Sequence, residues 1–210
     1  MEIEIYADVV CPWCWIGKRR LEQALESYHG EVTVRYRPFQ LDPTPVTEPK
    51  PLIEALGAKF GGRERAEGMA AHVTQVAAGA GIDMHFERAV AANTFEAHRL
   101  VRFATERGRA AELVERLYRA HFQDGIDVGS KDALVKLATE VGLDGTEARE
   151  YLESNLGRRE VAADLSAAHQ LGVSSVPTFV LAGKYAVTGA QEPETLLAAL
   201  REVEQRESAA

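Results

Sequence analysis

The sequence predicts an α/β fold in which a large, all-helical insertion separates a βαβ half from a ββα half. Three observations predict it: a strand–helix–strand pattern at the N-terminus, a long central stretch with helical spacing, and strand character that returns only near the C-terminus. Without the central helices, a small mixed sheet flanked by helices would remain. We expect a discontinuous sheet domain of residues 1–48 and 157–210, and a helical insertion domain of residues 49–156.

The composition is that of a globular protein with a sizeable core. The chain has 210 residues, of which 46% are hydrophobic and 27% charged. The net charge of −8 argues against nucleic acid as a main partner. Met1 leads directly into the Glu2–Ile5 segment without a basic or apolar leader, and no run approaches the roughly 18 apolar residues of a membrane span. We therefore expect a cytoplasmic protein with no membrane partner.

The N-terminal residues predict a parallel strand pair joined by a helix. Apolar residues from Ile3 to Val10 predict a buried strand, and the spacing from Pro12 to Tyr28 predicts a helix that His29-Gly30 ends. Apolar and polar residues then alternate from Val32 to Arg37, which predicts a second strand. A βαβ unit of this length implies parallel strands and a right-handed crossover.

The remaining elements follow from helical spacing and from turn residues. The proline-rich residues 38–51 predict an extended connection. Helices are expected at Leu52–Phe60, Glu64–Ala78, Thr94–Arg107, Arg109–Phe122, Lys131–Val141, Thr146–Asn155 and Arg158–Leu171. An antiparallel hairpin is expected from strands Pro177–Leu181 and Tyr185–Thr188, followed by a last helix that opens at Pro193. Disorder is expected only from Glu204 onward.

The Cys11-Pro12-Trp13-Cys14 segment contains the only two cysteines of the chain, at the junction of the first strand and helix. The thiolate is the reactive form of cysteine, and an ordinary thiol has a pKa near 8.5. Unpaired N–H groups and the helix dipole favour an anion in the first turn of a helix. We therefore expect Cys11 to be an exposed nucleophile and Cys14 to be the resolving thiol one turn deeper.

Other roles for this cysteine pair can be weighed from the sequence. The pair could instead be half of a zinc site or two inert buried thiols. A zinc site needs two more ligands, and no two of the six histidines have the spacing found in zinc fingers. No metal is therefore expected. Pro12 and Trp13 bring no positive charge, which predicts a reduction potential of about −180 to −270 mV. Asp8 could oppose a Cys11 thiolate, relay a proton to Cys14, or simply form the turn after the strand.

The chain resembles the thioredoxin superfamily, and within it the DsbA family and its FrnE-like branch. Four parts of the chain carry this likeness. They are the segment Asp8–Cys14, the helical insertion, the segment Gly172–Phe179, and, taken together, the two segments Asn93–Arg99 and Gly189–Gln191. The likeness spans essentially the whole chain. It implies a thioredoxin fold and a dithiol–disulfide oxidoreductase or isomerase that acts on protein or peptide thiols. No bound cofactor is implied, and glutathione remains a candidate co-substrate.

The resemblance also assigns supporting residues beside the cysteines. It implies that Pro177 is a cis-proline lying against the dithiol, and that the backbone of Val176 pairs with an extended substrate segment. Pro12 and Trp13 would support the cysteine pair, and Trp13 could form an apolar contact for substrate. Trp15 is expected in the core.

Three further residues are candidates for substrate contact: Asn93, His98 and Gln191. By resemblance, the helix that begins near Asn93 faces the dithiol. The alternative for Asn93 or Thr94 is a helix cap, and the alternative for His98 is a hydrogen-bonded buried histidine. Gln191 precedes the helix opened by Pro193, and its assignment rests on the resemblance alone.

Two departures from periplasmic relatives keep other functions open. Those proteins have a signal peptide and a histidine between the cysteines, where this chain has Trp13. One rival function is a glutathione-dependent isomerase or transferase of the 2-hydroxychromene-2-carboxylate isomerase or kappa class, which typically uses serine in place of the dithiol. A second rival is a non-catalytic peptide-binding module.

Exposed helix faces in the insertion could also form a homodimer.

Overall fold

The computed structural model describes residues 1–46 and 48–209 and has the predicted α/β architecture. Its sheet has four strands in the order β2-β1-β3-β4. The strands are β1 (Glu2–Ala7), β2 (Thr33–Pro38), β3 (Thr178–Leu181) and β4 (Tyr185–Thr188). β1 pairs parallel with β2 and antiparallel with β3, and β3 and β4 form the antiparallel hairpin. This mixed sheet is that of a thioredoxin fold, as predicted.

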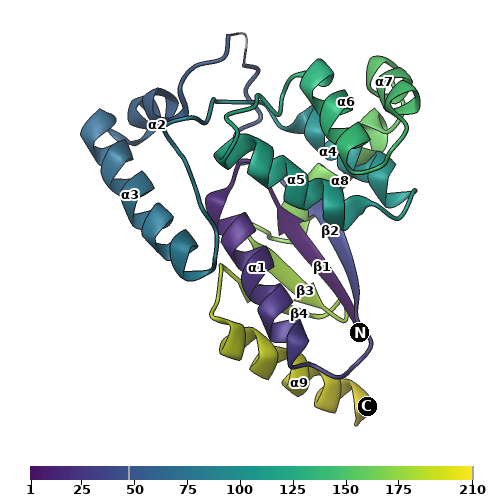
Figure 1. The fold of residues 1–210 in the computed structure, drawn as a ribbon. Helices are drawn as coiled ribbons and strands as arrows, with labels where there is room; N and C mark the ends of the chain where they lie inside the picture. The colour runs from purple at the N-terminus through teal and green to yellow at the C-terminus, as the bar shows by residue number, and fades with distance from the viewer. Residues whose placement is uncertain (47, 210) are drawn as a thin grey trace.

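Helices cover both faces of the sheet and form the insertion (Figure 1). α1 (Pro12–Glu26) and α9 (Pro193–Ser208) pack together on one face, and α8 (Arg158–Gln170) contacts β2 from the other. The insertion comprises α2 (Leu52–Phe60), α3 (Arg63–Gly79), α4 (Phe95–Thr105), α5 (Ala110–Phe122), α6 (Lys131–Glu140) and α7 (Gly145–Glu153). No helix of the described residues is both long enough and apolar enough to cross a membrane.

The alternation along β1 separates the two faces of the sheet. Ile3 and Ile5 are buried in the main core, whereas Tyr6 belongs to a small cluster with Phe39, Ala168 and other residues on the opposite face. Successive strand residues point to opposite faces, so this division follows from the sequence pattern. The end of β1 therefore carries buried groups on both sides.

Two local expectations were wrong. β1 ends at Ala7, and the next residues form a turn in which the Cys11 N–H donates to the carbonyl of Asp8 at 3.0 Å. Val9 and Val10 are apolar because they pack in the core, not because they extend the strand. At the other end, α9 continues to Ser208, where we expected disorder from Glu204. An ion pair of 2.6 Å between Lys184 and Glu207 ties this last turn to the hairpin.

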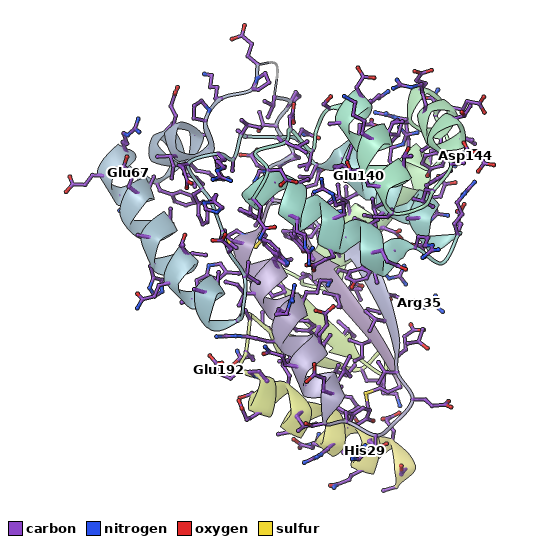
Figure 2. All side chains as sticks on the ribbon, viewed as in Figure 1. His29, Arg35, Glu67, Glu140, Asp144 and Glu192 are labelled. Carbon is purple, nitrogen blue, oxygen red and sulfur yellow. The ribbon has the colours of Figure 1, made fainter. Side chains whose placement is uncertain are left out.

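The sheet and the insertion share one core. Buried residues form a continuous cluster that runs from β1 through α1 into α3, α4, α5, α6 and α7. In Figure 1, α2 and α3 lie on one side of α1, and α6 and α7 lie on the other. Figure 2 labels three acidic residues of the insertion: Glu67 in α3, Glu140 in α6, and Asp144, which caps α7. The division into two domains at residues 48/49 and 156/157 remains a prediction.

The buried guanidinium of Arg99 joins α4 to the turn between α7 and α8. Arg99 is fully buried, and its N–H groups donate to the backbone carbonyls of Tyr151, Leu152, Ser154 and Leu156 at 2.6–3.1 Å. It also pairs with Glu96. One side chain thus supplies donors to four carbonyls at and just beyond the C-terminal end of α7.

His121 is a second buried polar residue, and it has no such partners. It lies in α5, fully buried, and neither ring nitrogen makes a hydrogen bond to a described residue. Burial lowers the pKa of His121 to about 4, against a smaller opposing effect of the Asp8 charge. The folded protein therefore holds this imidazole neutral.

Replacing Arg99 with methionine should lower the free energy of unfolding by about 3 kcal/mol or more, because a buried guanidinium that donates to four backbone carbonyls and pairs with Glu96 is lost, and Glu96 loses its buried partner. Urea unfolding followed by circular dichroism measures the loss. Arg102→Met is the control on the same helix: its side chain is 38% exposed, and the expected change is within about 0.5 kcal/mol. Equal losses in the two variants would contradict the role given to Arg99.

The low pKa of the buried His121 should make the stability of the protein depend on pH. Between its folded pKa of about 4 and the ordinary value of 6.5, the unfolded chain binds a proton that the folded protein does not. Stability should therefore fall as the pH drops, by on the order of 2 kcal/mol between pH 7 and pH 5. His121→Phe should remove this part of the pH dependence in urea titrations. If the free energy of unfolding of His121→Phe still fell by the same amount between pH 7 and pH 5, His121 would not be the source of the pH dependence.

Candidate active site

The turn after β1 places both cysteines at the start of α1. Cys11 is the N-cap residue with φ −92° and ψ 114°, and Pro12 occupies the first helical turn. Proline suits this position because its missing N–H would have no helical partner there. The N–H of Cys14 donates to the carbonyl of Cys11 at 3.1 Å, which folds the motif into one turn. Both thiols are free.

Both cysteines are buried, which differs from the expectation for Cys11. The exposed fraction is 3% for Cys11 and 1% for Cys14. The position of Cys11 at a helix N-terminus, taken alone, predicts an exposed sulfur. The groups that cover Cys11 come from distant parts of the chain, including the loop before β3.

The Cys14 thiol ionises less readily than an ordinary cysteine. Burial raises the pKa of Cys14 well above its ordinary value, and its hydrogen bond with Cys11 and the charge of that residue raise it further. A backbone hydrogen bond from Asp8 offsets only part of this effect. Cys14 is therefore a protonated thiol at neutral pH, and its S–H group can stabilise a charge on Cys11.

The loop before β3 closes over the dithiol. The Val176–Pro177 peptide bond is cis, as the family resemblance implied. The thiol of Cys11 lies 3.8 Å from the carbonyl oxygen of Val176, to which it donates. The carbonyl of Pro177 accepts from the N–H of Gly189 at 2.8 Å, so the turn after β4 supports the loop.

Gly17 allows α1 to approach this loop, and its role was not found from the sequence. A Cβ atom at this position would lie 2.8 Å from Cγ of Pro177 and 3.2 Å from Cζ of Phe179. Only a residue without a side chain permits this contact one turn after Cys14. The glycine looks unremarkable in the sequence, because it lies within a helix and its partner is far away in the chain.

Asp8 lies buried beneath the cysteine turn and has an exposed fraction of 1%. Its Oδ2 accepts from the N–H of Leu41 at 2.8 Å. Its Oδ1 lies 3.3 Å from Nε2 of His98 but makes no hydrogen bond, because that nitrogen directs its hydrogen to the carbonyl of Phe39 at 2.9 Å. One carboxylate oxygen of a fully buried acid is thus left without a donor.

The remaining predicted substrate residues have structural partners. Oδ1 of Asn93 accepts from the N–H of Phe95 at the start of α4, and its Nδ2 donates to the carbonyls of Pro43 and Thr44. His98 is 6% exposed and hydrogen-bonded. These contacts favour the capping and buried-histidine alternatives for the two residues. Gln191 is exposed and donates to the carbonyl of Thr188, in the turn that supports Pro177.

The two tryptophans have the two environments that were expected. Trp13 is half-buried, with its ring 6.2 Å from that of His72 in α3. Trp15 is buried against Tyr118, and its Nε1 donates to Glu115 at 3.3 Å. Glu115 also accepts from the buried Lys18 at 2.8 Å, which joins α1 to α5.

Tyr118 and Glu115 were missed because nothing in the sequence connects α5 to the cysteine motif. Burial raises the pKa of Tyr118 well above its ordinary value, so its hydroxyl group stays neutral, and its ring stacks on Trp15 of α1. In residues 1–46 and 48–209, no group of three or more His, Cys, Asp or Glu side chains could hold a metal ion.

Comparisons with known proteins agree with this geometry. The family model for the DSBA-like thioredoxin domain matches residues 2–201. A probable DsbA oxidoreductase from Streptomyces coelicolor is 38% identical, with a TM-score of 0.90 over 96% of this chain and 89% of that one. The YwbO protein of Bacillus subtilis (strain 168) is 29% identical over 193 residues, which is 90% of each chain.

A 2-hydroxychromene-2-carboxylate isomerase shares the fold, with a TM-score of 0.74 and 17% identity over 100% of this chain and 98% of its own. The match to the family model covers nearly the whole chain and includes the cysteine motif and the cis-proline loop. The chain therefore belongs to the DSBA-like thioredoxin domain family.

Proposed function

We propose that this thiol–disulfide oxidoreductase exchanges disulfides through Cys11 and Cys14, with a mixed disulfide as the intermediate. The observation that supports this most is the arrangement of the free thiols: Cys11 caps α1 beneath the Val176 carbonyl, and a protonated Cys14 hydrogen-bonds to it. A nucleophile backed by a second thiol can release a captured substrate without another protein.

The exchange proceeds in two steps. The Cys11 thiolate attacks one sulfur of a substrate disulfide, so a Cys11–substrate S–S bond forms and the other substrate sulfur leaves as a thiolate. The Cys14 thiol then loses its proton and attacks Cys11, which forms the Cys11–Cys14 disulfide and releases the second substrate thiolate. The reverse sequence oxidises a substrate dithiol. The compartment's redox poise determines the net direction.

We propose protein or peptide thiols as the substrates. The Val176 carbonyl, which accepts from the Cys11 thiol in the free protein, becomes available when that sulfur turns toward a substrate. It can then accept an N–H from an extended chain, in the manner of strand addition. The half-buried Trp13 offers an apolar surface next to Cys14. Neither contact depends on a particular substrate side chain, which suits an enzyme acting on many thiols.

The glutathione-dependent isomerase is the rival that shares this fold. Such an enzyme needs one activated group beside bound glutathione and has no use for a resolving thiol. The buried Cys14, hydrogen-bonded to Cys11, favours dithiol exchange instead. Glutathione remains a candidate co-substrate for either function.

Replacing Cys14 with serine should trap the mixed disulfide. Incubated with oxidised glutathione, Cys14→Ser should accumulate one glutathione per protein, measured by mass spectrometry, and its turnover in an insulin reduction assay should fall by roughly 100-fold or more. Cys11→Ser should form no adduct. A Cys14→Ser protein with undiminished turnover would support the isomerase alternative, and an adduct on Cys11→Ser would reverse the roles of the cysteines.

The raised pKa of Cys14 predicts the order of alkylation. Only the thiolate reacts with iodoacetamide, so the reduced protein at pH 7 should be labelled at Cys11 while Cys14 stays unmodified. Labelling of Cys14 should rise about tenfold per pH unit as more of it ionises, until its pKa is reached. Tandem mass spectrometry of the peptide that contains both cysteines distinguishes the sites. Faster labelling of Cys14 than of Cys11 would refute the assignment.

A further inference from the structure

We propose that the segment Phe39–Thr44 forms the wall of the substrate site opposite the cis-proline loop, where Leu41 contacts an apolar side chain next to the substrate cysteine and Asn93 holds the segment in place. We call this segment the strap. The inference rests on the proposed function and adds a side-chain preference to it. Leu41 is the specificity-determining residue, and Asn93 is a positioning residue that acts through the strap.

The order of the strands places Cys11 between the strap and the cis-proline loop. β1 lies between β2 and β3 in the sheet. Because β2 is parallel and β3 antiparallel to β1, the end of β2 and the start of β3 lie at the same end of the sheet as the end of β1. Cys11 follows β1, the strap follows β2, and Pro177 directly precedes β3. Figure 1 shows this end of the sheet, where α1 begins and the connection from β2 to α2 departs. A substrate disulfide that reaches Cys11 therefore meets one segment on each side.

A shared hydrogen-bond partner fixes the strap beside the cysteine turn. The carbonyl of Asp8 accepts from the N–H of Cys11 at 3.0 Å. The Oδ2 atom of Asp8 accepts from the N–H of Leu41 at 2.8 Å. The main chains at Cys11 and Leu41 are thus bonded to the same buried residue, so Leu41 is a neighbour of the nucleophile although the two are far apart in the sequence.

The side chain of Leu41 offers apolar surface to a substrate. It is 45% exposed, whereas most large apolar side chains of the described residues are buried. An apolar group that covers it gains free energy by removing that surface from water. The side chains next to a substrate cysteine are the first to reach this position, because the cysteine itself must reach Cys11. The Val176 carbonyl on the other side of Cys11 can hold the substrate backbone, which leaves side-chain selection to the strap.

Side chains at the start of α4 hold the strap by directed hydrogen bonds. Nδ2 of Asn93 donates to the carbonyls of Pro43 and Thr44 at 3.0 and 3.1 Å. Nε2 of Gln40 donates to Oδ1 of Asn93 and to Oγ1 of Thr94, both at 3.4 Å. The strap is therefore tied to the helix at two points, one on each side of Leu41.

The strap depends on these side chains because residues 39–44 form neither helix nor strand. Asn93 serves the strap and the helix at once, since its Oδ1 also accepts from the N–H of Phe95 at 3.0 Å. The amide of asparagine can do both because one end accepts and the other donates. This double use gives Asn93 a role in the site without a contact to the substrate.

The test compares peptide disulfides that differ only beside the cysteine. Three short peptides carry leucine, glutamate or lysine on both sides of one cysteine, and each is oxidised to its symmetrical disulfide. Reduced protein is mixed with an excess of each, and acid-quenched samples are analysed by mass spectrometry for the Cys11–Cys14 disulfide, which forms as two peptide thiols are released. Each rate constant is divided by that of the same peptide with dithiothreitol, which corrects for the peptide's own reactivity. Ratios between peptides are then compared, because a general loss of activity cancels from them.

Charge reversal at Leu41 tests the contact. The wild type should react with the leucine peptide about tenfold faster than with the glutamate peptide. Leu156, in the turn between α7 and α8 and 64% exposed, provides matched controls that add the same charge elsewhere. Relative to Leu156→Glu, Leu41→Glu should favour the lysine peptide over the glutamate peptide by about threefold, and Leu41→Lys should show the opposite order relative to Leu156→Lys. Peptide ratios that are the same in Leu41→Glu and Leu41→Lys would overturn the contact.

Asn93→Asp tests the support of the strap. Aspartate keeps the acceptor for the Phe95 N–H but cannot donate to the strap carbonyls, so α4 stays capped while the strap is released. The preference for the leucine peptide should fall to about twofold or less. Ser130→Asp, which adds the same charge at the N-cap of α6, should keep the wild-type preference.

An undiminished leucine preference in Asn93→Asp, or a wild type that reacts equally with all three peptides, would also overturn the proposal, while the proposed function would stand. A wild type that forms no Cys11–Cys14 disulfide with any of the peptides would instead refute the proposed function.

Discussion

The site depends on the contact between the first turns of α1 and the loop that ends in cis-Pro177. Gly17 leaves room for Pro177 on the helix surface, and the Cys11 thiol meets the Val176 carbonyl at 3.8 Å. These two contacts fix the depth at which the cysteines lie below the surface. They also place a backbone acceptor directly over the reactive sulfur. The sheet makes this possible because β1 and β3 are antiparallel neighbours, so that the C-terminal end of β1 and the start of β3 lie at the same end of the sheet.

Burial determines the chemistry of the groups below that contact. A low-dielectric environment favours neutral forms, which explains the protonated Cys14, the neutral Tyr118 and the neutral His121. Asp8 is also buried there, and its Oδ1 lies 3.3 Å from Nε2 of His98.

The helical insertion contributes to the site directly. α4 supplies His98, and α5 supplies Tyr118 and Glu115, which holds Lys18 and Trp15 of α1. At a distance from the site, Arg99 fixes α4 to the end of α7. Thus α4 and α5 of the insertion place side chains against α1 and the turn that follows β1. The continuous core explains how a segment inserted in the chain can position residues so accurately.

The sequence alone determined the fold class, the element order and the cysteine pair, because helical and strand periodicity and the spacing of Cys11 and Cys14 are local properties. The family resemblance added the cis state of Pro177. Only the tertiary structure decided the burial of Cys11, the contact at Gly17, and the pairing of Asp8 with His98. Each of these joins residues far apart in the chain, and their geometry follows from how the sheet and insertion pack. Local patterns do not encode such distances, so the sequence left His98 as either a substrate contact or a hydrogen-bonded buried histidine, and the fold shows it buried and bonded to the carbonyl of Phe39.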